Sequence, residues 1–276
     1  MLLPYRSFTI VVLFSIQVDM VDFAQSLSGF VVGVIVGLTG VGGGSLMTPL
    51  LVLLFGVNPA TAVGTDLLYA AITKSGGTFV HARKGHVNWR ITGLLASGSL
   101  PAAGITLFAV HTYAPGGLGG ASHAITVALG FALLLTAVAL VFRHQLRQFA
   151  QSHDPKTQRH PSFTIVTGAI LGILVSISSV GAGALGVTAL FFLYPKFSAI
   201  RIVGSDLAHA VPLTLVAGLG HWWLGSVDWQ LLGALLLGSL PGIYIGSHLS
   251  SRVPDHYLRP ALAGMLVLVG GRLIAF

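Results

Sequence analysis

The chain has 276 residues, of which 54% are hydrophobic and only 8% are charged, and its mean hydropathy is +0.88. A soluble globular protein carries about 25% charged residues, so this composition excludes a soluble domain and predicts a protein that resides in the lipid bilayer. The net charge of +7 is not interpreted as a nucleic-acid footprint, because the basic residues lie in short loops between apolar runs. The lack of cysteine excludes disulfides, thiolate metal sites and cysteine catalysis.

The first residues, 1–19, form an N-terminal extension. Arg6 precedes an apolar run over 8–18, which is typical of a signal peptide, but no small-residue cleavage pattern follows. Met20 stands just before a complete first segment. An added interfacial helix or a start at Met20 would each account for this stretch.

Ten apolar segments follow, separated by polar, glycine or proline residues. They are expected at 26–39, 45–56, 60–80, 90–112, 123–142, 163–177, 184–195, 201–221, 229–249 and 257–275. A helix needs about 20 apolar residues to cross the hydrocarbon layer, and the longer segments approach or reach that length. The sequence therefore predicts an all-α polytopic membrane protein.

Two pairs of short segments each flank a glycine-rich tip. Residues 40–44 read Gly-Val-Gly-Gly-Gly, and residues 178–183 read Ser-Ser-Val-Gly-Ala-Gly. Glycine runs interrupt helices, and non-helical backbone at membrane depth is tolerated only where protein buries it or where it lines a watery cavity. Each pair is predicted to be a helical hairpin broken at its tip.

The positions of Lys and Arg predict the orientation. The loops after residue 80 and near residues 150, 198 and 255 are basic and should be cytoplasmic, whereas the loops at 57–59, 113–122 and 222–228 contain no Lys or Arg and should lie outside. The predicted sides alternate without conflict if each glycine-tipped pair enters and leaves on one face.

The sequence repeats itself at an offset of 140 positions. Residues 63–67 match 203–207, and 98–101 match 238–241, while the glycine tips align at an offset of 139. We therefore divide the chain into a first repeat at 20–145, a cytoplasmic linker at 146–161 and a second repeat at 162–276. The charge map places equivalent loops on opposite sides, so the two repeats should have inverted topology, an architecture common in secondary transporters.

These motifs resemble a known family. The glycine tip with Pro49, the Val-Gly-Thr-Asp-Leu segment at 63–67, the Gly-His-Val-Asn-Trp loop at 85–89 and the degenerate second copy are similar to the TauE/SafE sulfite exporters, also called toluenesulfonate uptake permeases. The resemblance covers about residues 20–275. It implies a multi-pass transporter of the bacterial inner (plasma) membrane that moves sulfite, sulfoacetate or a related organosulfonate.

The glycine tips are the first candidates for the substrate site. Backbone N–H groups at a broken helix, with the positive end of the following helix dipole, can bind an oxyanion, and nearby hydroxyls can donate to it. The candidates are Thr39, Gly42, Gly43, Gly44 and Ser45 in the first tip and Ser178, Ser179, Gly181 and Gly183 in the second. The alternative is that glycines serve only close helix packing, as we expect for Gly29, Gly33, Gly238 and Gly242 at four-residue spacing.

Four further residues carry titratable groups within the predicted spans. Lys74 could attract an anion, or its side chain could extend toward the cytoplasmic end of its segment. Asp66 and Asp206 are equivalent in the repeat, and His209 shares a helical face with Asp206. These three could carry a coupling proton, although Asp66 and Asp206 could instead cap their helices.

The sequence thus favours a secondary transporter of small sulfur-containing anions, working by alternating access, with export and proton coupling as the finer expectation. A passive anion channel is the alternative. An intramembrane enzyme is disfavoured because no Gly-x-Ser-Gly elbow occurs. No cofactor or metal is expected, since the histidines lack ligand spacing. The substrate anion and the lipid bilayer are the expected partners, and a homo-oligomer is compatible with the sequence.

Overall fold

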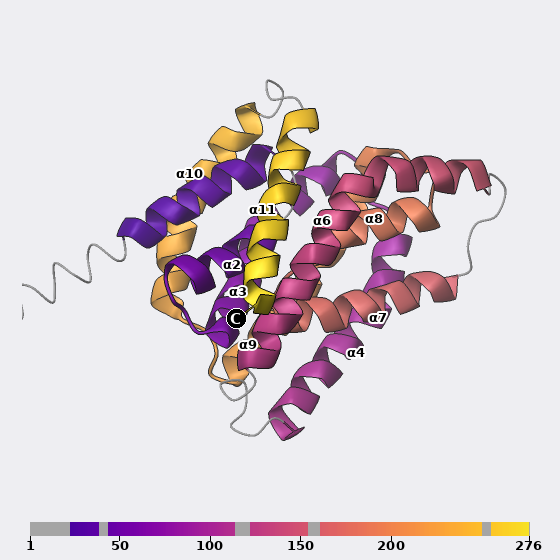
Figure 1. Ribbon diagram of the computed structural model, residues 1–276. Helices are drawn as coiled ribbons and strands as arrows, with labels where there is room; N and C mark the ends of the chain where they lie inside the picture. Colours follow the sequence, from indigo (N-terminus) through magenta and orange to yellow (C-terminus); the bar gives the residue numbers. More distant parts are fainter. Residues whose placement is uncertain (1–22, 39–43, 114–121, 154–160, 250–254, 276) are drawn as a thin grey trace, which may run out of the picture.

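The computed structural model describes residues 23–38, 44–113, 122–153, 161–249 and 255–275, and the regular structure in these ranges is entirely α-helical (Figure 1). The helices are Phe23–Leu38, α2 (Gly44–Leu54), α3 (Pro59–Arg83), α4 (Trp89–Tyr113), α6 (Ser122–His153), α7 (Pro161–Ser178), α8 (Ala184–Leu193), α9 (Ala199–Trp223), α10 (Trp229–Leu249) and α11 (Asp255–Ala275). Each predicted segment corresponds to one helix. The all-α fold is confirmed.

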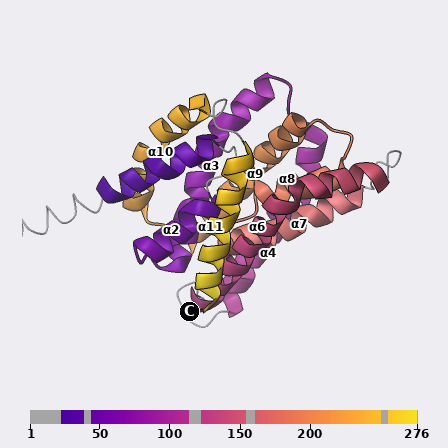
Figure 2. The same cartoon turned by 45° about the horizontal axis from the view of Figure 1, so that its top comes forward.

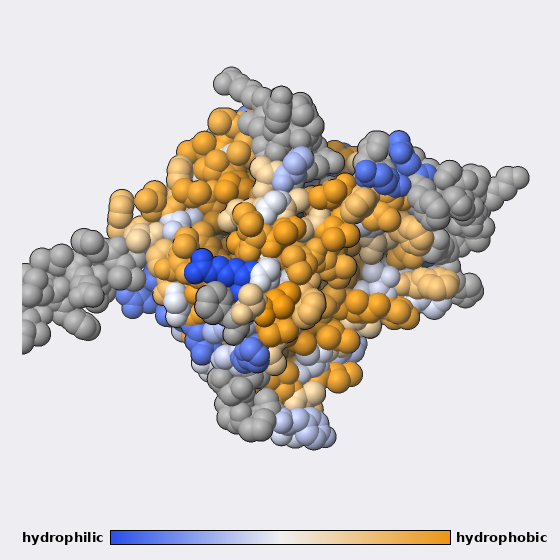
Figure 3. All heavy atoms as spheres, viewed as in Figure 1, coloured by the Kyte–Doolittle hydropathy of each residue, from blue (hydrophilic) through white to orange (hydrophobic). Residues whose placement is uncertain are grey.

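Five of the helices in the described part of the chain are long and apolar enough to cross a membrane. They are α4, the part of α6 at 122–142, α7, α9, and the part of α10 at 229–246. Together with the shorter apolar helices Phe23–Leu38, α8 and 260–275, they make this a multi-pass membrane protein. Large hydrophobic side chains such as Ile105, Leu237 and Leu268 are more than 60% exposed, and Figure 3 shows a mostly hydrophobic face over the helices. Such a surface is stable in contact with lipid rather than water.

Helix α3 is as long as α4 but is not among the five, because its central part is polar. Its first half is buried in protein, and it packs along α9 over much of its length. Both helices lie behind α11 and α6 in the view of Figure 1, and the turned view in Figure 2 keeps α9 inside the bundle. A helix surrounded by protein does not need the apolar outer face of a lipid-facing helix.

The ends of α3 and α9 are built alike. Gly85 and Gly225 follow the last helical turns with φ of 68° and 72°, a backbone conformation that favours glycine. In both places the next amide reaches back, from His86 to the carbonyl of His81 and from Ser226 to that of His221, each at 2.9 Å. These residues differ by 140 positions, so the repeat found in the sequence recurs in the helix ends.

The small-residue stripes pack helices closely, as predicted. A Cβ on Gly29 or Gly33 would lie 2.5 Å from the backbone carbonyl oxygen of Leu235 or Ser239 on α10. In the second repeat, Cβ atoms on Gly168 and Gly172 of α7 would meet the carbonyls of Leu95 and Ser99 on α4. Helix Phe23–Leu38 therefore packs on α10 just as α7 packs on α4, and Figures 1 and 2 show both pairs side by side.

Hydrogen bonds between the repeats are also reciprocal. The amide of Asn88 donates to Ser205 Oγ at 2.8 Å, and the amide of Asp228 donates to Thr65 Oγ1 at 3.0 Å. Asn88 lies in the loop after α3 and bonds to α9, whereas Asp228 lies in the loop after α9 and bonds to α3. The orientation of the two repeats across a bilayer stays a prediction.

The second broken hairpin is also present as predicted. Helix α7 ends at Ser178, α8 begins at Ala184, and the residues between them are not helical. Helix α6 continues to His153, so helical structure extends into the stretch 146–161 that we assigned to the linker.

Candidate functional site

Polar side chains gather in the middle of the bundle, where α3 and α9 pack together and where the second tip approaches them. We call this group the central polar cluster. Every member is at most 6% exposed. Its members are Thr48, Asp66, Tyr69, Lys74, Ser99, Ser179, Asp206, His209 and Ser239.

Lys74 connects α3 to the second tip. Its Nζ donates a hydrogen bond to the carbonyl oxygen of Ala182 at 3.0 Å, and its side chain is 6% exposed. The side chain therefore runs to the tip inside the protein and does not extend toward the cytoplasmic end of α3. The ammonium group also interacts electrostatically with Asp66 and Asp206, so it is the cation placed between the two equivalent carboxylates.

Asp66 is fully buried on α3. Its Oδ2 accepts a hydrogen bond from Thr48 Oγ1 of α2 at 2.5 Å. The hydroxyl of Ser179 lies beside the same carboxylate, but the geometry is not that of a hydrogen bond. Asp66 Oδ1 and Ser179 Oγ are both buried without a hydrogen-bond partner in the described part of the chain.

Neither aspartate caps its helix, because each lies two turns inside it. The N-cap of α3 is Asn58, whose Oδ1 accepts from the amide of Ala60 at 3.0 Å, and the N-cap of α9 is Ser198. Asp206 instead packs against the first turn of α8, since a Cβ on Gly186 would collide with its Oδ1. A carboxylate near the start of a helix is stabilised by the positive end of the helix dipole.

His209 and Tyr69 occupy equivalent positions, 140 residues apart, and each faces the equivalent serine of the other repeat. His209 Nε2 lies 2.8 Å from Ser99 Oγ on α4. The phenol of Tyr69 lies beside Ser239 on α10 without forming a hydrogen bond. The sequence placed His209 on the same helical face as Asp206 and did not predict its contact with Ser99 of α4.

The second tip has an unusual backbone. Ser179 has a φ of 58°, and Gly181 and Gly183 have φ of 127° and 125°, values that only glycine adopts readily. Gly183 is the N-cap of α8 and offers no side chain, so no side chain caps the first N–H groups of this helix. The Ser178 hydroxyl donates to the carbonyl of Leu174 at 2.7 Å. Of the predicted hydroxyl donors in this tip, Ser179 is the one without a protein acceptor.

For the first tip, Thr39, Gly42 and Gly43 lie outside the described residues. Gly44 and Ser45 form the first turn of α2. Helix α2 therefore begins at the end of the glycine run, as α8 does after the second tip.

The tryptophans and His221 differ in exposure. Trp89, Trp222, Trp223 and Trp229 are all more than 50% exposed, which is typical of residues at a membrane interface. His221, near the end of α9, is 1% exposed, and its Nε2 lies 2.8 Å from the carbonyl oxygen of Ser176 on α7. It connects α9 to the helix that ends at the second tip.

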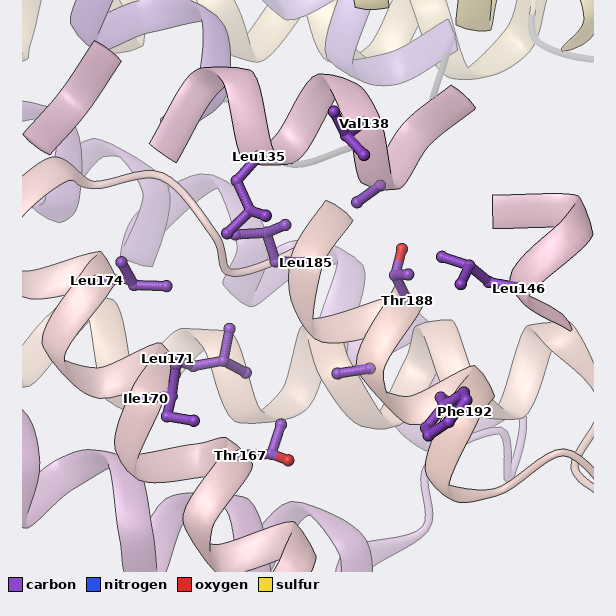
Figure 4. A pocket seen from close by; sticks show the side chains of 12 residues that line it. Leu135, Val138, Leu146, Thr167, Ile170, Leu171, Leu174, Leu185, Thr188 and Phe192 are labelled. Atoms are coloured by element: carbon purple, nitrogen blue, oxygen red, sulfur yellow. The ribbon is translucent and has the colours of Figure 1, made fainter. Parts of the chain in front are cut away.

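A pocket of about 420 Å³ lies between α6, α7 and α8 (Figure 4). Its lining is aliphatic and aromatic apart from Thr167 and Thr188. Because this lining contains no charged side chain, the pocket is unsuited to a small anion. Leu171 and Leu185 line it and also stand next to Gly181, so they separate the pocket from the second tip.

Several members of the central polar cluster were not predicted as site residues. Ser99 and Ser239 lie in the repeated Gly-Ser-Leu-Pro motifs, and Tyr69 is the equivalent of His209, so the repeat itself was the signal that could have identified them. Thr48 had no such signal. The contact with the Ala182 carbonyl had no signal either, because every residue has a backbone carbonyl and the sequence does not distinguish one from another.

The protein combines lipid-facing helices with a broken hairpin and the buried central polar cluster. These features define a multi-pass protein of the membrane-transporter class. The TauE/SafE sulfite exporter model matches residues 26–273. The chain belongs to this family.

Curated relatives match nearly the whole chain. The chain is 40% identical over 252 residues to the probable membrane transporter protein YjnA of Bacillus subtilis, covering 90% of this chain and 98% of YjnA. It is 27% identical to the probable membrane transporter protein YdhB of the same organism, covering 87% and 97% of the two chains. It is 25% identical to the probable membrane transporter protein MJ0441 of Methanocaldococcus jannaschii, covering 88% and 91%. No solved structure matches the chain.

Proposed function

We propose that the protein is a secondary transporter that exports a small sulfur-containing anion, such as sulfite, sulfoacetate or a related organosulfonate, across the inner membrane of a bacterium. The family name supports the substrate class. The observation that carries the proposal is Lys74, a buried cation held at a broken helix tip by the carbonyl of Ala182. A cation within a span is costly and usually serves transport or binding.

The anion would bind at the second tip. The N–H groups of the first turn of α8 and the Ser179 hydroxyl would donate to its oxygens, and Lys74 would move from Ala182 to the anion. The first tip would complete the site through the start of α2. Such a site recognises an oxyanion by hydrogen-bond donors and needs only one fixed cation.

Alternating access would follow from the reciprocal packing. Helix Phe23–Leu38 with α10, and α7 with α4, each combine one helix from either repeat. We propose that the two repeats have inverted topology, so that the contacts of one repeat in the inward-open state become those of the other in the outward-open state. The reciprocal bonds of Asn88 and Asp228 support this.

The two carboxylates require charge compensation. With Asp66 and Asp206 ionised and Lys74 charged, the cluster carries one net negative charge, which repels an anion. Proton uptake would remove this repulsion, so we propose that anion transport is coupled to proton binding in the cluster.

Counterflow in proteoliposomes tests the function. Vesicles loaded with unlabelled sulfite or sulfoacetate should accumulate the labelled anion from outside without any ion gradient, because a carrier exchanges the two anions. A channel would equilibrate the label without this transient accumulation. No movement of either anion under any ion gradient would refute the substrate class.

The tips are tested by Gly43→Leu, which should abolish counterflow while the protein is still expressed and inserted. Gly104→Leu is the matched control, because Gly104 lies on the exposed side of α4 with no atom within 4 Å of an added Cβ. Full activity of Gly43→Leu would remove the first tip from the site.

A further inference from the structure

Within the described residues, Asp66 Oδ1 and Ser179 Oγ are two buried polar atoms that have no hydrogen-bond partner, and their side chains lie beside each other. Asp66 is 0% exposed and Ser179 is 3% exposed. Buried polar atoms without partners are rare in proteins, and each requires an explanation. The gap between these two side chains is therefore a candidate for an additional ligand.

The chemistry of the two groups selects the ligand. An ionised carboxylate can only accept hydrogen bonds, and Asp66 Oδ2 already accepts one from Thr48. An oxyanion placed against Oδ1 would bring acceptor against acceptor. A proton satisfies both atoms, because a protonated Oδ1 can donate to Ser179 Oγ, and the hydroxyl of Ser179 stays free to donate elsewhere.

The charged surroundings agree with this choice. Lys74 of the same helix is the described charged group that acts electrostatically on Asp66, and it acts on Asp206 of α9 as well. Tyr69 and His209 are the other titratable members of the cluster. From α2 and α10, the cluster receives only the hydroxyls of Thr48 and Ser239. A hard metal cation beside Asp66 would need several oxygen ligands close to the ammonium group of Lys74, whereas a proton binds to Oδ1 alone and neutralises the carboxylate.

The arrangement occurs once, although the repeat supplies two aspartates. In the sequence repeat, Val187 is equivalent to Thr48 and Gly40 is equivalent to Ser179, so neither hydroxyl recurs in the other copy. Asp206 therefore has neither hydroxyl at these positions and packs against the start of α8 instead. The hydroxyl pair distinguishes Asp66 from its equivalent.

The site also connects the two repeats, since Asp66 belongs to α3 and Ser179 to the tip between α7 and α8. We propose that Asp66 and Ser179 form a proton-binding site, which adjoins the proposed anion site at Ser179 and couples anion movement to the proton gradient. The Asp66 carboxylate takes one proton from the aqueous side to which the site is open, donates it as a hydrogen bond to Ser179 Oγ, and releases it on the other side. This inference rests on the proposed transport function.

Asp66→Asn is the main test, because the amide imitates the neutral, hydrogen-bond-donating carboxyl group. With sulfoacetate, whose charges do not change between about pH 6 and 8, the variant should keep counterflow within about threefold of the native protein. Accumulation driven by a pH gradient should fall at least tenfold. Asp255→Asn makes the same chemical change outside the cluster, at the first residue of α11, and should keep both activities.

Ser179→Gly removes the acceptor while glycine keeps the left-handed backbone of this position. Since the bound proton loses its partner, the pH at which transport is half-maximal should move to a more acidic value by at least half a unit. Accumulation that persists in Asp66→Asn, or an unchanged pH profile in Ser179→Gly, would overturn the inference. A requirement for sodium in place of a pH gradient would overturn it as well.

Infrared difference spectroscopy of the purified protein provides a test that needs no substrate. The C=O stretch of protonated carboxyl groups should appear as the pH is lowered, and its intensity should be smaller in Asp66→Asn than in the native protein by the contribution of one carboxyl group. Equal intensity in both proteins would refute a proton on Asp66. Absence of counterflow in the native protein would refute the transport proposal alone, so the two failures are distinguishable.

Discussion

Replacing Lys74 by methionine should destabilise the protein and stop transport. Methionine keeps the length of the side chain but leaves the carbonyl of Ala182 without its donor and the carboxylates of Asp66 and Asp206 without the ammonium group. Removing the donor of a buried carbonyl costs about 1–3 kcal/mol, and hydrogen bonds to charged groups lie toward the upper end of that range. We expect a loss of about 2–3 kcal/mol in the free energy of unfolding.

Thermal unfolding in detergent, followed by tryptophan fluorescence, measures this loss. At about 2–4 °C per kcal/mol, the melting temperature should fall by about 5–10 °C. Lys84→Met is the matched control, because Lys84 is exposed at the end of the same helix, and it should change the stability by less than about 0.5 kcal/mol.

A double variant separates charge from packing. If the carboxylate of Asp206 is destabilised when Lys74 is lost, Asp206→Asn should recover at least about 1 kcal/mol in the Lys74→Met background. A Lys74→Met protein that melts with the native protein and transports at the native rate would show that the ammonium group is not held in the cluster. The same result would also refute the proposed role of Lys74 at the second tip.

Three further predictions concern packing, the contacts between repeats, and topology. Gly98→Leu should lower the melting temperature by at least about 5 °C, because the leucine side chain would meet the backbone of α7. Gly104→Leu on the same helix should leave the melting temperature unchanged. Equal melting temperatures of the two variants would contradict the packing of α4 on α7. Ser205→Ala should cost about 1 kcal/mol by removing the acceptor of a loop amide, and an unchanged unfolding curve would argue against that bond. In this cysteine-free chain, single cysteines at Gly119 and Gly85 should be labelled from outside and inside, respectively, and equal external labelling would overturn the predicted orientation.

The sequence by itself determined the class of fold and most of its elements. Scarcity of charge required a bilayer, apolar length predicted the helices that the described residues form, and glycine runs located the break between α7 and α8. These features are encoded locally, because hydrophobicity and backbone freedom act over one or two helical turns. The 140-residue repeat also identified which positions are equivalent.

Only the tertiary structure decided what the equivalent positions contact. From the sequence, Lys74 could contact either an anion or the membrane surface. In the structure, its ammonium group donates a hydrogen bond to the carbonyl of Ala182, 108 residues away. Asp66 was open to a capping interpretation until Asn58 was found at the cap, and nothing in the sequence indicated that Ser179 lies beside the Asp66 carboxylate. Such contacts depend on how helices from the two repeats pack together, and a side chain's identity does not specify the partner that packing brings to it.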